Sequence, residues 1–254
     1  MIDGFVDVGA MLQQPDWPQL AAADGGEHLV LTDLEPQAWA PPVLRPSKII
    51  CVGLNYREHI LEMGHELPTY PTLFAKYPEA IIGPNDPILV PSTALETLDW
   101  EGELAIIVGR KVRRADRDTA ADAIAGYTVM NDVTVRGYQY RTTQWLQGKT
   151  FESTTPLGPV VVTPDDFTSG ARLTTHVGEE LVQDADTDDL VFDSSTLIAY
   201  VSEVITLNPG DIVATGTPAG VGHALKPPRY LQAGNVLTTR IEGLGTLANI
   251  VTLL

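Results

Sequence analysis

The chain has 254 residues, enough for one large domain or for a large domain with a small appendage. Its 33 acidic and 16 basic side chains give a formal net charge of -17, which argues against nucleic acid and anionic membrane surfaces as partners. The single cysteine excludes an intramolecular disulfide, and no apolar run approaches the roughly 20 residues of a membrane span.

The first part of the chain differs from the rest in its mixed polarity. This part ends in a stiff connector, in which Pro41, Pro42 and Pro46 favour an extended backbone. We therefore predict a small N-terminal accessory subdomain over residues 1–45 and one larger domain over residues 46–254. The first residues include early acids and no basic flank, unlike a signal peptide, so we expect a cytoplasmic protein.

The elements after this connector begin with a buried strand over residues 48–53 (KIICVG). Helical spacing follows over residues 54–64, and Gly64 is the expected end of that helix. Residues 66–78 are rich in proline, which predicts a loop without regular structure. Residues 80–91 (AIIGPNDPILVP) predict short strands around a turn.

The second half of the chain alternates between strands and a few helices. A buried strand is predicted within residues 97–109 (TLDWEGELAIIVG). An alanine-rich helix follows over residues 113–127, with Asp118 or Thr119 as its cap and Gly126 as its end. The later predictions are a strand over 127–134, a loop and strand over 148–167, a hairpin over 172–187 that turns at Gly178, a helix over 196–207, and β-rich segments over 209–222 and 237–254.

Acidic residues alternate at the start of the strand in residues 97–109. Asp99, Glu101 and Glu103 share one face of an extended chain, where like charges raise one another's pKa. A bound divalent cation removes this repulsion, because carboxylates are hard oxygen ligands suited to Mg²⁺, Mn²⁺ or Ca²⁺. Asp132, at the end of a later strand, is the candidate third ligand. The alternative is that Glu101 and Glu103 are exposed residues at the start of a strand, and spacing alone leaves both open.

Six segments resemble, in sequence and in order, the fumarylacetoacetate hydrolase superfamily. They are KIICVGLNYREHILEMG, DWEGELAIIVG, GYTVMNDVT, QGKTF, PLGPVVVTPDDF and PGDIVATGTPAGVG. The resemblance covers about residues 47–254 and implies a mixed β fold with some α: a rolled β-sandwich with a small N-terminal subdomain. It also implies a homodimer, and a divalent metal, Mg²⁺ or Mn²⁺, held by Glu101, Glu103 and Asp132.

A histidine and a glutamate stand three residues apart in the predicted helix over residues 54–64. His59 and Glu62 share a helix face, where the carboxylate would orient the imidazole as a general base. The alternative is an exposed pair of little consequence. The resemblance matches them to a His/Glu pair on a short mobile helix that closes over the substrate and activates water. Residues 67–78 would then belong to the lid.

Four further side chains gain roles through the resemblance. Lys149 would lie beside the metal and bind the substrate carboxylate or a developing enolate oxygen, whereas otherwise it is a solvated loop lysine. Gln139 and Arg136 would contact the substrate, although Gly137 stands where the family commonly has an acid, which weakens the case for Arg136. The Thr217 hydroxyl would contact the substrate carboxylate. The alternative is that its segment is a plain turn with no substrate contact.

These residues together favour a metal-dependent hydrolase that cleaves a C–C bond in a 2,4-dioxo acid of the acylpyruvate type, in the breakdown of aromatic compounds. The same site suits two other reactions, decarboxylation of a 2-oxo acid such as oxaloacetate and isomerisation of a 2-hydroxydienoate. An alternative hypothesis is that the protein is not an enzyme and serves as a module that binds a metal or a small molecule. The expected partner is therefore a small 2-oxo or 2,4-dioxo acid.

Overall fold

The structure is a computed structural model that describes residues 4–22, 35, 38–62, 66–167 and 169–254; the side chains of His59 and Glu62 lie outside this description. The strands are β1 (Ile49–Gly53), β2 (Thr72–Lys76), β3 (Ile81–Ile82), β4 (Ile88–Val90), β5 (Leu98–Asp99), β6 (Gly102–Val108), β7 (Ile124–Asn131), β8 (Thr134–Val135), β9 (Thr155–Val162), β10 (Arg172–Val177), β11 (Glu180–Asp186), β12 (Ile212–Ala214), β13 (Val236–Ile241) and β14 (Gly245–Leu253). The α-helices are α1 (Val8–Leu12), α2 (Trp17–Ala22), α3 (Arg57–Glu62), α4 (Ser92–Leu95), α5 (Arg117–Asp122), α6 (Arg136–Gln139), α7 (Leu146–Lys149) and α8 (Ser194–Val204).

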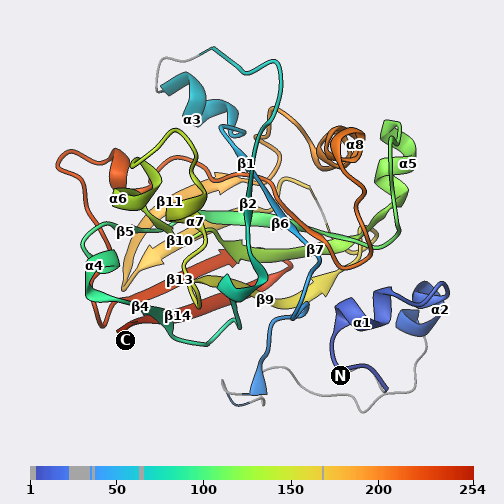
Figure 1. Ribbon diagram of the computed structural model, residues 1–254, viewed down its shortest axis with the longest axis horizontal. Coiled ribbons are helices and arrows are strands. Elements are labelled where there is room, and N and C mark those ends of the chain that lie inside the picture. The colour runs from blue at the N-terminus through green and yellow to red at the C-terminus, as the bar shows by residue number, and fades with distance from the viewer. Residues whose placement is uncertain (1–3, 23–34, 36–37, 63–65, 168) are drawn as a thin grey trace.

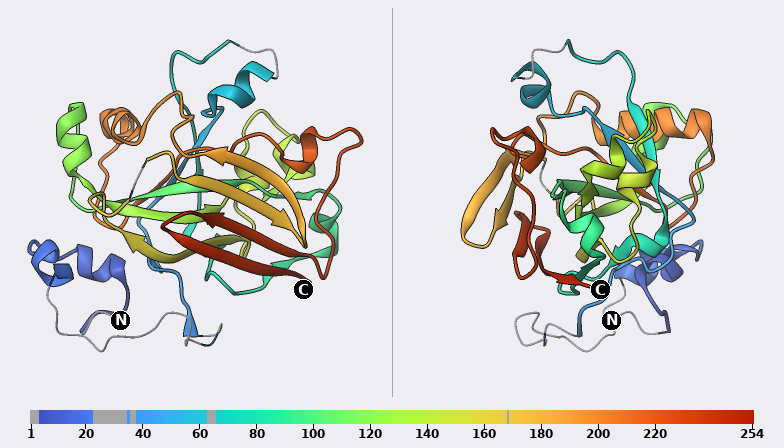
Figure 2. Two further views of the ribbon diagram at one scale, coloured as in Figure 1. Left: turned by 180° about the vertical axis from the view of Figure 1, so that it is seen from behind. Right: turned by 60° about the vertical axis from the view of Figure 1, so that its left-hand side comes forward.

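Two curled sheets stack against each other and form the body of the protein (Figures 1 and 2). The larger has the strand order β2-β1-β12-β6-β7-β9-β3, and the smaller has the order β11-β10-β13-β14-β4. Between them, Leu104 and Val129 of the larger sheet pack with Leu173, Ile241 and Leu247, whose side chains all come from the smaller sheet. The predicted mixed β fold with a few helices is thereby confirmed.

Helices α5 and α8 lie side by side against the larger sheet, next to the smaller sheet and on the same face (Figure 1). Leu197 and Val201 of α8 are buried there in one apolar cluster with Ile106, which lies on the same face of β6 as Leu104. The Asp193 carboxylate accepts a hydrogen bond from the Thr196 backbone N–H and so begins α8 close to the predicted position. The opposite face of β6 is covered by the apolar cluster that includes helix α1, which explains why every residue of β6 is buried.

The two N-terminal helices pack against this opposite face of the larger sheet. Met11 and Leu12 of α1 join the apolar cluster that contains Ile49 and Cys51, and the Trp17 indole donates a 2.9 Å hydrogen bond to the Gly109 carbonyl. The division near residue 45 stays a prediction. Part of the accessory segment, residues 23–34, lies outside the described residues, as does the predicted helix end at Gly64.

Two local predictions are wrong. The alanine-rich helix is capped by Asp116, two residues before the nearer of the two expected caps, and it ends at Asp122. Gly126 lies within β7 instead, where a side chain would not fit: a Cβ would come within 2.3 Å of the Val162 carbonyl oxygen on the neighbouring strand. The proline-rich segment also contains β2, which pairs antiparallel with β1 over all five of its residues.

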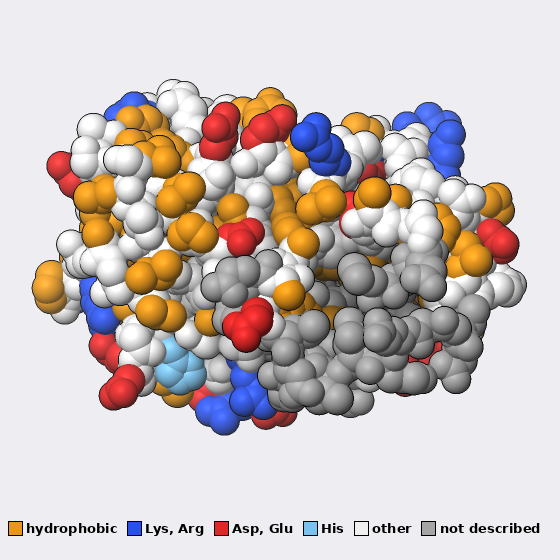
Figure 3. Space-filling view, turned by 90° about the horizontal axis from the view of Figure 1, so that it is seen from below, with side chains coloured by type: hydrophobic (Ala, Val, Ile, Leu, Met, Phe, Trp, Pro, Cys, Tyr) orange, Lys and Arg blue, Asp and Glu red, His pale blue; other side chains and the backbone are white. Residues whose placement is uncertain are grey.

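The surface carries both apolar and charged side chains. On the face seen from below, hydrophobic side chains cover much of the described area, and acidic and basic side chains occur singly or in small groups among them (Figure 3). None of the helices in the described part of the chain has the length and apolar character needed to cross a membrane.

The turn after Thr217 requires a glycine at Gly220. Its φ is +97°, and a Cβ there would lie 1.9 Å from the Val182 carbonyl oxygen. We expect Gly220→Ala to lower the free energy of unfolding by about 3 kcal/mol, since it combines backbone strain with a clash against rigid backbone. Urea denaturation measures the loss.

Gly234→Ala is the matched control. Gly234 has a similar φ of +86°, but nothing lies within 4 Å of the added Cβ. It therefore introduces only the left-handed backbone cost of about 1–2 kcal/mol. Equal losses for the two variants would contradict the clash with Val182.

Candidate metal and substrate site

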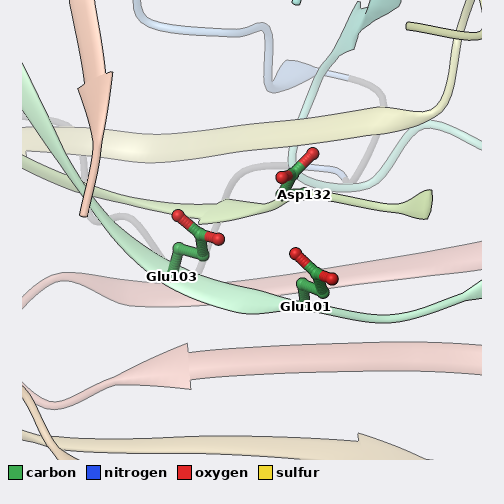
Figure 4. Close-up of side chains that lie close together, drawn as sticks. All are labelled: Glu101, Glu103 and Asp132. Atoms are coloured by element: carbon green, nitrogen blue, oxygen red, sulfur yellow. The ribbon is translucent and has the colours of Figure 1, made fainter. Parts of the chain in front are cut away.

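Three buried carboxylates converge at one end of the larger sheet. Strands β6 and β7 are antiparallel with Gly102 opposite Asn131, and the Asp132 backbone N–H donates a 2.8 Å hydrogen bond to the Glu101 carbonyl. This register brings Glu101, Glu103 and Asp132 together, and one oxygen from each lies within 4.8 Å of the other two (Figure 4). Their residues are 7%, 1% and 0% exposed, so the alternative of exposed strand-end acids is wrong.

The chemistry of this donor set fits a hard divalent cation. Each carboxylate offers about four lone-pair sites, so an oxygen that already accepts a hydrogen bond can still bind a metal. Glu103 Oε2 accepts a 2.8 Å hydrogen bond from the Gly216 backbone N–H. Buried carboxylates are unfavourable without compensating positive charge, and Mg²⁺ or Mn²⁺ would supply such charge.

Two lysines already neutralise part of the cluster. Lys149 Nζ lies 2.6 Å from Glu101 Oε2 and 2.8 Å from Asp132 Oδ2, and Lys76 Nζ lies 2.6 Å from Asp132 Oδ1. Both lysines are at most 2% exposed, so Lys149 is not the solvated loop residue of the alternative reading. Helix α7 ends at Lys149 and brings it to the cluster, whereas Lys76 arrives at the end of β2.

Lys76 is a site residue that the sequence prediction missed. The expected loop over residues 66–78 concealed it, because a loop lysine is ordinarily solvated. A usable signal exists in the alternation of this stretch: Phe74 and Lys76 stand two apart and share a strand face. Phe74 lines the same cavity as Lys149, with the Lys149 ammonium 4.8 Å from the centre of its ring.

Burial and neighbouring charges set the ionisation of the cluster. Burial raises the pKa of Glu103, and the charges of Asp132 and Glu101 raise it further. Burial also opposes ionisation of Asp132, but Lys149 and Lys76 outweigh this and hold its pKa below the usual value. For Lys149, burial is outweighed by Asp132 and Glu101, which raise its pKa and keep it protonated.

Arg136 is oriented by Asp99. The guanidinium donates from Nε to Asp99 Oδ2 at 2.8 Å, lies 2.7 Å from Glu101 Oε1 through Nη1, and donates from Nη1 to Gln139 Oε1 at 2.9 Å. Nη2 is buried without a hydrogen-bond partner among the described residues. Asp99, expected on the face of Glu101 and Glu103, is separated from them by the break between β5 and β6. Asp99 orients the Arg136 guanidinium even though Gly137 stands where the family commonly has an acid.

The predicted substrate residues border one cavity of about 200 Å³. It is lined by Val52, Gly53, Leu54, Phe74, Glu101, Glu103, Arg136, Gln139, Tyr140, Trp145, Lys149, Thr217, Val221, His223 and Ala224. The lining thus joins two of the three carboxylates to a wall of aromatic and aliphatic side chains. This combination suits a small anion that has an apolar middle.

Thr217 is held in place by a buried glutamine that the sequence prediction also missed. The Thr217 hydroxyl donates to the Gly102 carbonyl at 3.0 Å and accepts from Gln183 Nε2 at 2.9 Å. Gln183 Oε1 in turn accepts from the Gly102 backbone N–H at 2.9 Å. The side chain of Gln183 therefore ties the smaller sheet to the strand that carries Glu103.

Helix α3 contains the predicted base pair. Its range, Arg57–Glu62, includes both His59 and Glu62, whose side chains lie outside the described part of the structure. Tyr56 and Ile60 are each 1% exposed and attach this helix to the body of the protein. The proposed lid over residues 67–78 requires correction at its second half, since Thr72–Lys76 is a paired strand of the larger sheet.

Comparisons with known proteins give consistent similarities. A family model described as the C-terminal part of fumarylacetoacetate hydrolase matches residues 48–252. A mitochondrial oxaloacetate tautomerase of Xenopus laevis is 44% identical over 212 residues, which cover 82% of this chain and 66% of that protein. The chain therefore spans about two thirds of the length of this relative.

Solved structures show the same relationship. A fumarylacetoacetate hydrolase from Exiguobacterium antarcticum has 43% identity and a TM-score of 0.79, and the match covers 85% of this chain and 78% of that one. A 5-carboxymethyl-2-hydroxymuconate delta-isomerase from Mycobacterium smegmatis has 38% identity and a TM-score of 0.79, with 91% and 86% covered.

Proposed function

The chain belongs to the fumarylacetoacetate hydrolase family, and on that premise we propose that it interconverts the enol and keto forms of a small 2-oxo dicarboxylic acid such as oxaloacetate. The observation that carries the proposal is the cluster of Glu101, Glu103 and Asp132 beside Lys149 in one cavity. The cavity volume of about 200 Å³ is below the usual range for drug-sized ligands, which favours an acid of a few carbons.

A divalent cation, Mg²⁺ or Mn²⁺, would be held by Glu101, Glu103 and Asp132, and when bound it supplies positive charge that polarises a 2-oxo acid. The protein itself contributes a preorganised set of donors. The Lys149 ammonium stabilises negative charge that develops as the enolate forms, and the two carboxylates that bind it hold it in place. The Arg136 guanidinium and Gln139 orient the substrate carboxylate.

Tautomerisation moves one proton between C3 of the acid and its 2-oxo oxygen, so it requires a base but no attacking water. We assign the base to His59, oriented by Glu62, as the sequence predicts. The Xenopus relative is named an oxaloacetate tautomerase, and a solved relative is named an isomerase, so two similar proteins carry names for proton-transfer reactions.

C–C bond hydrolysis of a 2,4-dioxo acid is the second candidate. It is favoured by helix α3, which places a His and a Glu three residues apart next to the body of the protein. Such a pair suits activation of water as well as removal of a C–H proton. Decarboxylation of oxaloacetate would use the same donors without a base.

One panel of substrates separates these reactions. Purified protein with Mn²⁺ is incubated with enol oxaloacetate, an acylpyruvate and a 2-hydroxydienoate, while enol absorbance and pyruvate release are followed. We expect the loss of oxaloacetate enol to be at least about tenfold faster than any other reaction. Acylpyruvate cleavage without enol conversion would favour the hydrolase. No turnover with either Mn²⁺ or Mg²⁺ would favour the binding module.

The oligomeric state and the cellular location of the protein stay proposals. We propose a homodimer, as the family resemblance implies, and sedimentation equilibrium tests it. Localisation is also open to test, since the Xenopus relative is named as mitochondrial, and imaging of the tagged protein is the deciding measurement.

A further inference from the structure

His223 is an ionisable side chain of the cavity wall that the proposed reaction does not use. It lies in the short 3-10 helix Gly222–Ala224, is half-buried, and lines the cavity next to Val221 and Ala224. A histidine in this position offers a ring N–H to any group that reaches the wall.

The imidazole is fixed from several sides. Its Nδ1 lies 2.8 Å from the Tyr230 hydroxyl, and its ring centre lies 5.2 Å from that of Tyr140. The His223 backbone N–H donates a 3.0 Å hydrogen bond to Asp99 Oδ2. When the Tyr230 hydroxyl donates to Nδ1, the ring proton is on Nε2, which has no hydrogen-bond partner among the described residues. Nε2 is then available to a ligand.

Asp99 connects this histidine to the reacting end of the cavity. The same oxygen, Oδ2, accepts from Arg136 Nε at 2.8 Å and from the His223 backbone N–H. These two nitrogens are therefore within two hydrogen-bond lengths of each other. Since Arg136 also contacts Glu101, two side chains, those of Asp99 and Arg136, connect His223 to a candidate metal ligand.

The cations that line the cavity are paired with carboxylates of the protein, so His223 is a suitable hydrogen-bond donor for a second carboxylate of the substrate. Lys149 is held by Glu101 and Asp132, and Arg136 is held by Asp99 and Glu101. A dicarboxylate that places one end at the metal cluster still has a distal carboxylate to satisfy, because buried anions require hydrogen-bond donors.

We propose that His223 donates a hydrogen bond from Nε2 to the distal carboxylate of the substrate and so selects dicarboxylic over monocarboxylic 2-oxo acids. Tyr230 and Asp99 are positioning residues for this contact, the former for the ring and the latter for the backbone. The inference rests on the proposed function, since it takes the reacting end of the acid to lie at Glu101, Glu103 and Asp132.

Oxaloacetate and pyruvate form a matched ligand pair, because they differ by the distal carboxylate alone. Their affinities for the Mn²⁺-loaded protein are measured by calorimetry, together with KM and kcat for oxaloacetate. We expect His223→Leu to weaken oxaloacetate binding about tenfold and raise its KM similarly, while pyruvate affinity stays unchanged. His223→Gln, which keeps an N–H donor, should recover part of the loss, and Tyr230→Phe should show a smaller loss.

His176→Leu is the control, because His176 is half-buried on β10 and does not line this cavity. Circular dichroism confirms that each variant is folded. Equal loss of both ligands in His223→Leu and His223→Gln, or no loss of either, would overturn the inference and leave the proposed function intact. Wild-type protein that bound neither ligand would overturn the proposed function, and the inference with it.

Discussion

Glu103→Gln is expected to reduce activity about a thousandfold and to weaken Mn²⁺ binding at least about a hundredfold, without destabilising the metal-free protein. The reason is that Glu103 lies 1% exposed with a pKa raised by burial, so its charge is a cost to the fold that a cation offsets. A glutamine of the same shape can still accept the hydrogen bond from the Gly216 backbone N–H.

The measurements are Mn²⁺ titration and thermal unfolding with and without the metal. Wild-type protein should gain about 2.7 kcal/mol of stability at a free Mn²⁺ concentration of about 100 times Kd, and Glu103→Gln should gain almost none at that concentration. The melting temperature of the metal-free variant should equal or exceed that of the metal-free wild type. A clear drop in that temperature would show that Glu103 serves the fold instead.

Asp211→Asn provides a matched control for the loss of a buried carboxylate. Asp211 is fully buried, forms an ion pair with Lys48 and accepts hydrogen bonds from Ser47 and Asn208 outside the cavity. We expect this variant to lose about 1–3 kcal/mol of stability and to keep its Mn²⁺ affinity. The two substitutions thus separate the cost of removing a structural carboxylate from that of removing a metal ligand.

The carboxylate cluster was predictable because it depends on local pattern and on one strand pairing. Alternation puts Glu101 and Glu103 on one face, and the polar residues that end the strand after Val129 mark where Asp132 enters. The antiparallel register of β6 and β7 then brings Asp132 next to Glu101. The family resemblance supplied the third ligand, which spacing could only suggest.

The electrostatic partners of the cluster were harder to predict, because each comes from a contact far apart in the sequence. Lys76 reaches Asp132 across 56 positions, and Gln183 reaches Gly102 across 81. Asp99 belongs to the acidic alternation, but that pattern does not predict its partner Arg136. The prediction of a loop at β2 was wrong because local composition was its basis. The pairing of β2 with β1 outweighs the effect of the flanking prolines.

The second large effect is expected for Lys149→Met, which should lower kcat about 100- to 1000-fold while Mn²⁺ binds more tightly than to the wild type. Lys149 lies between Glu101 and Asp132 and also lines the cavity, so its ammonium both opposes a cation at the cluster and faces the substrate. Removing it leaves the carboxylates more negative, which favours the metal, and removes a donor for the developing enolate charge.

Lys76→Met is the comparison that separates these two consequences. Lys76 contacts the same Asp132 and is equally buried, but it is absent from the lining of the cavity. Both variants lose one ammonium from the cluster, so both should bind Mn²⁺ more tightly, whereas kcat should fall less than about tenfold in Lys76→Met. Equal losses of kcat would mean that Lys149 acts only by balancing charge. A loss confined to Lys149→Met would place the developing negative charge next to its ammonium, where an enolate mechanism requires it.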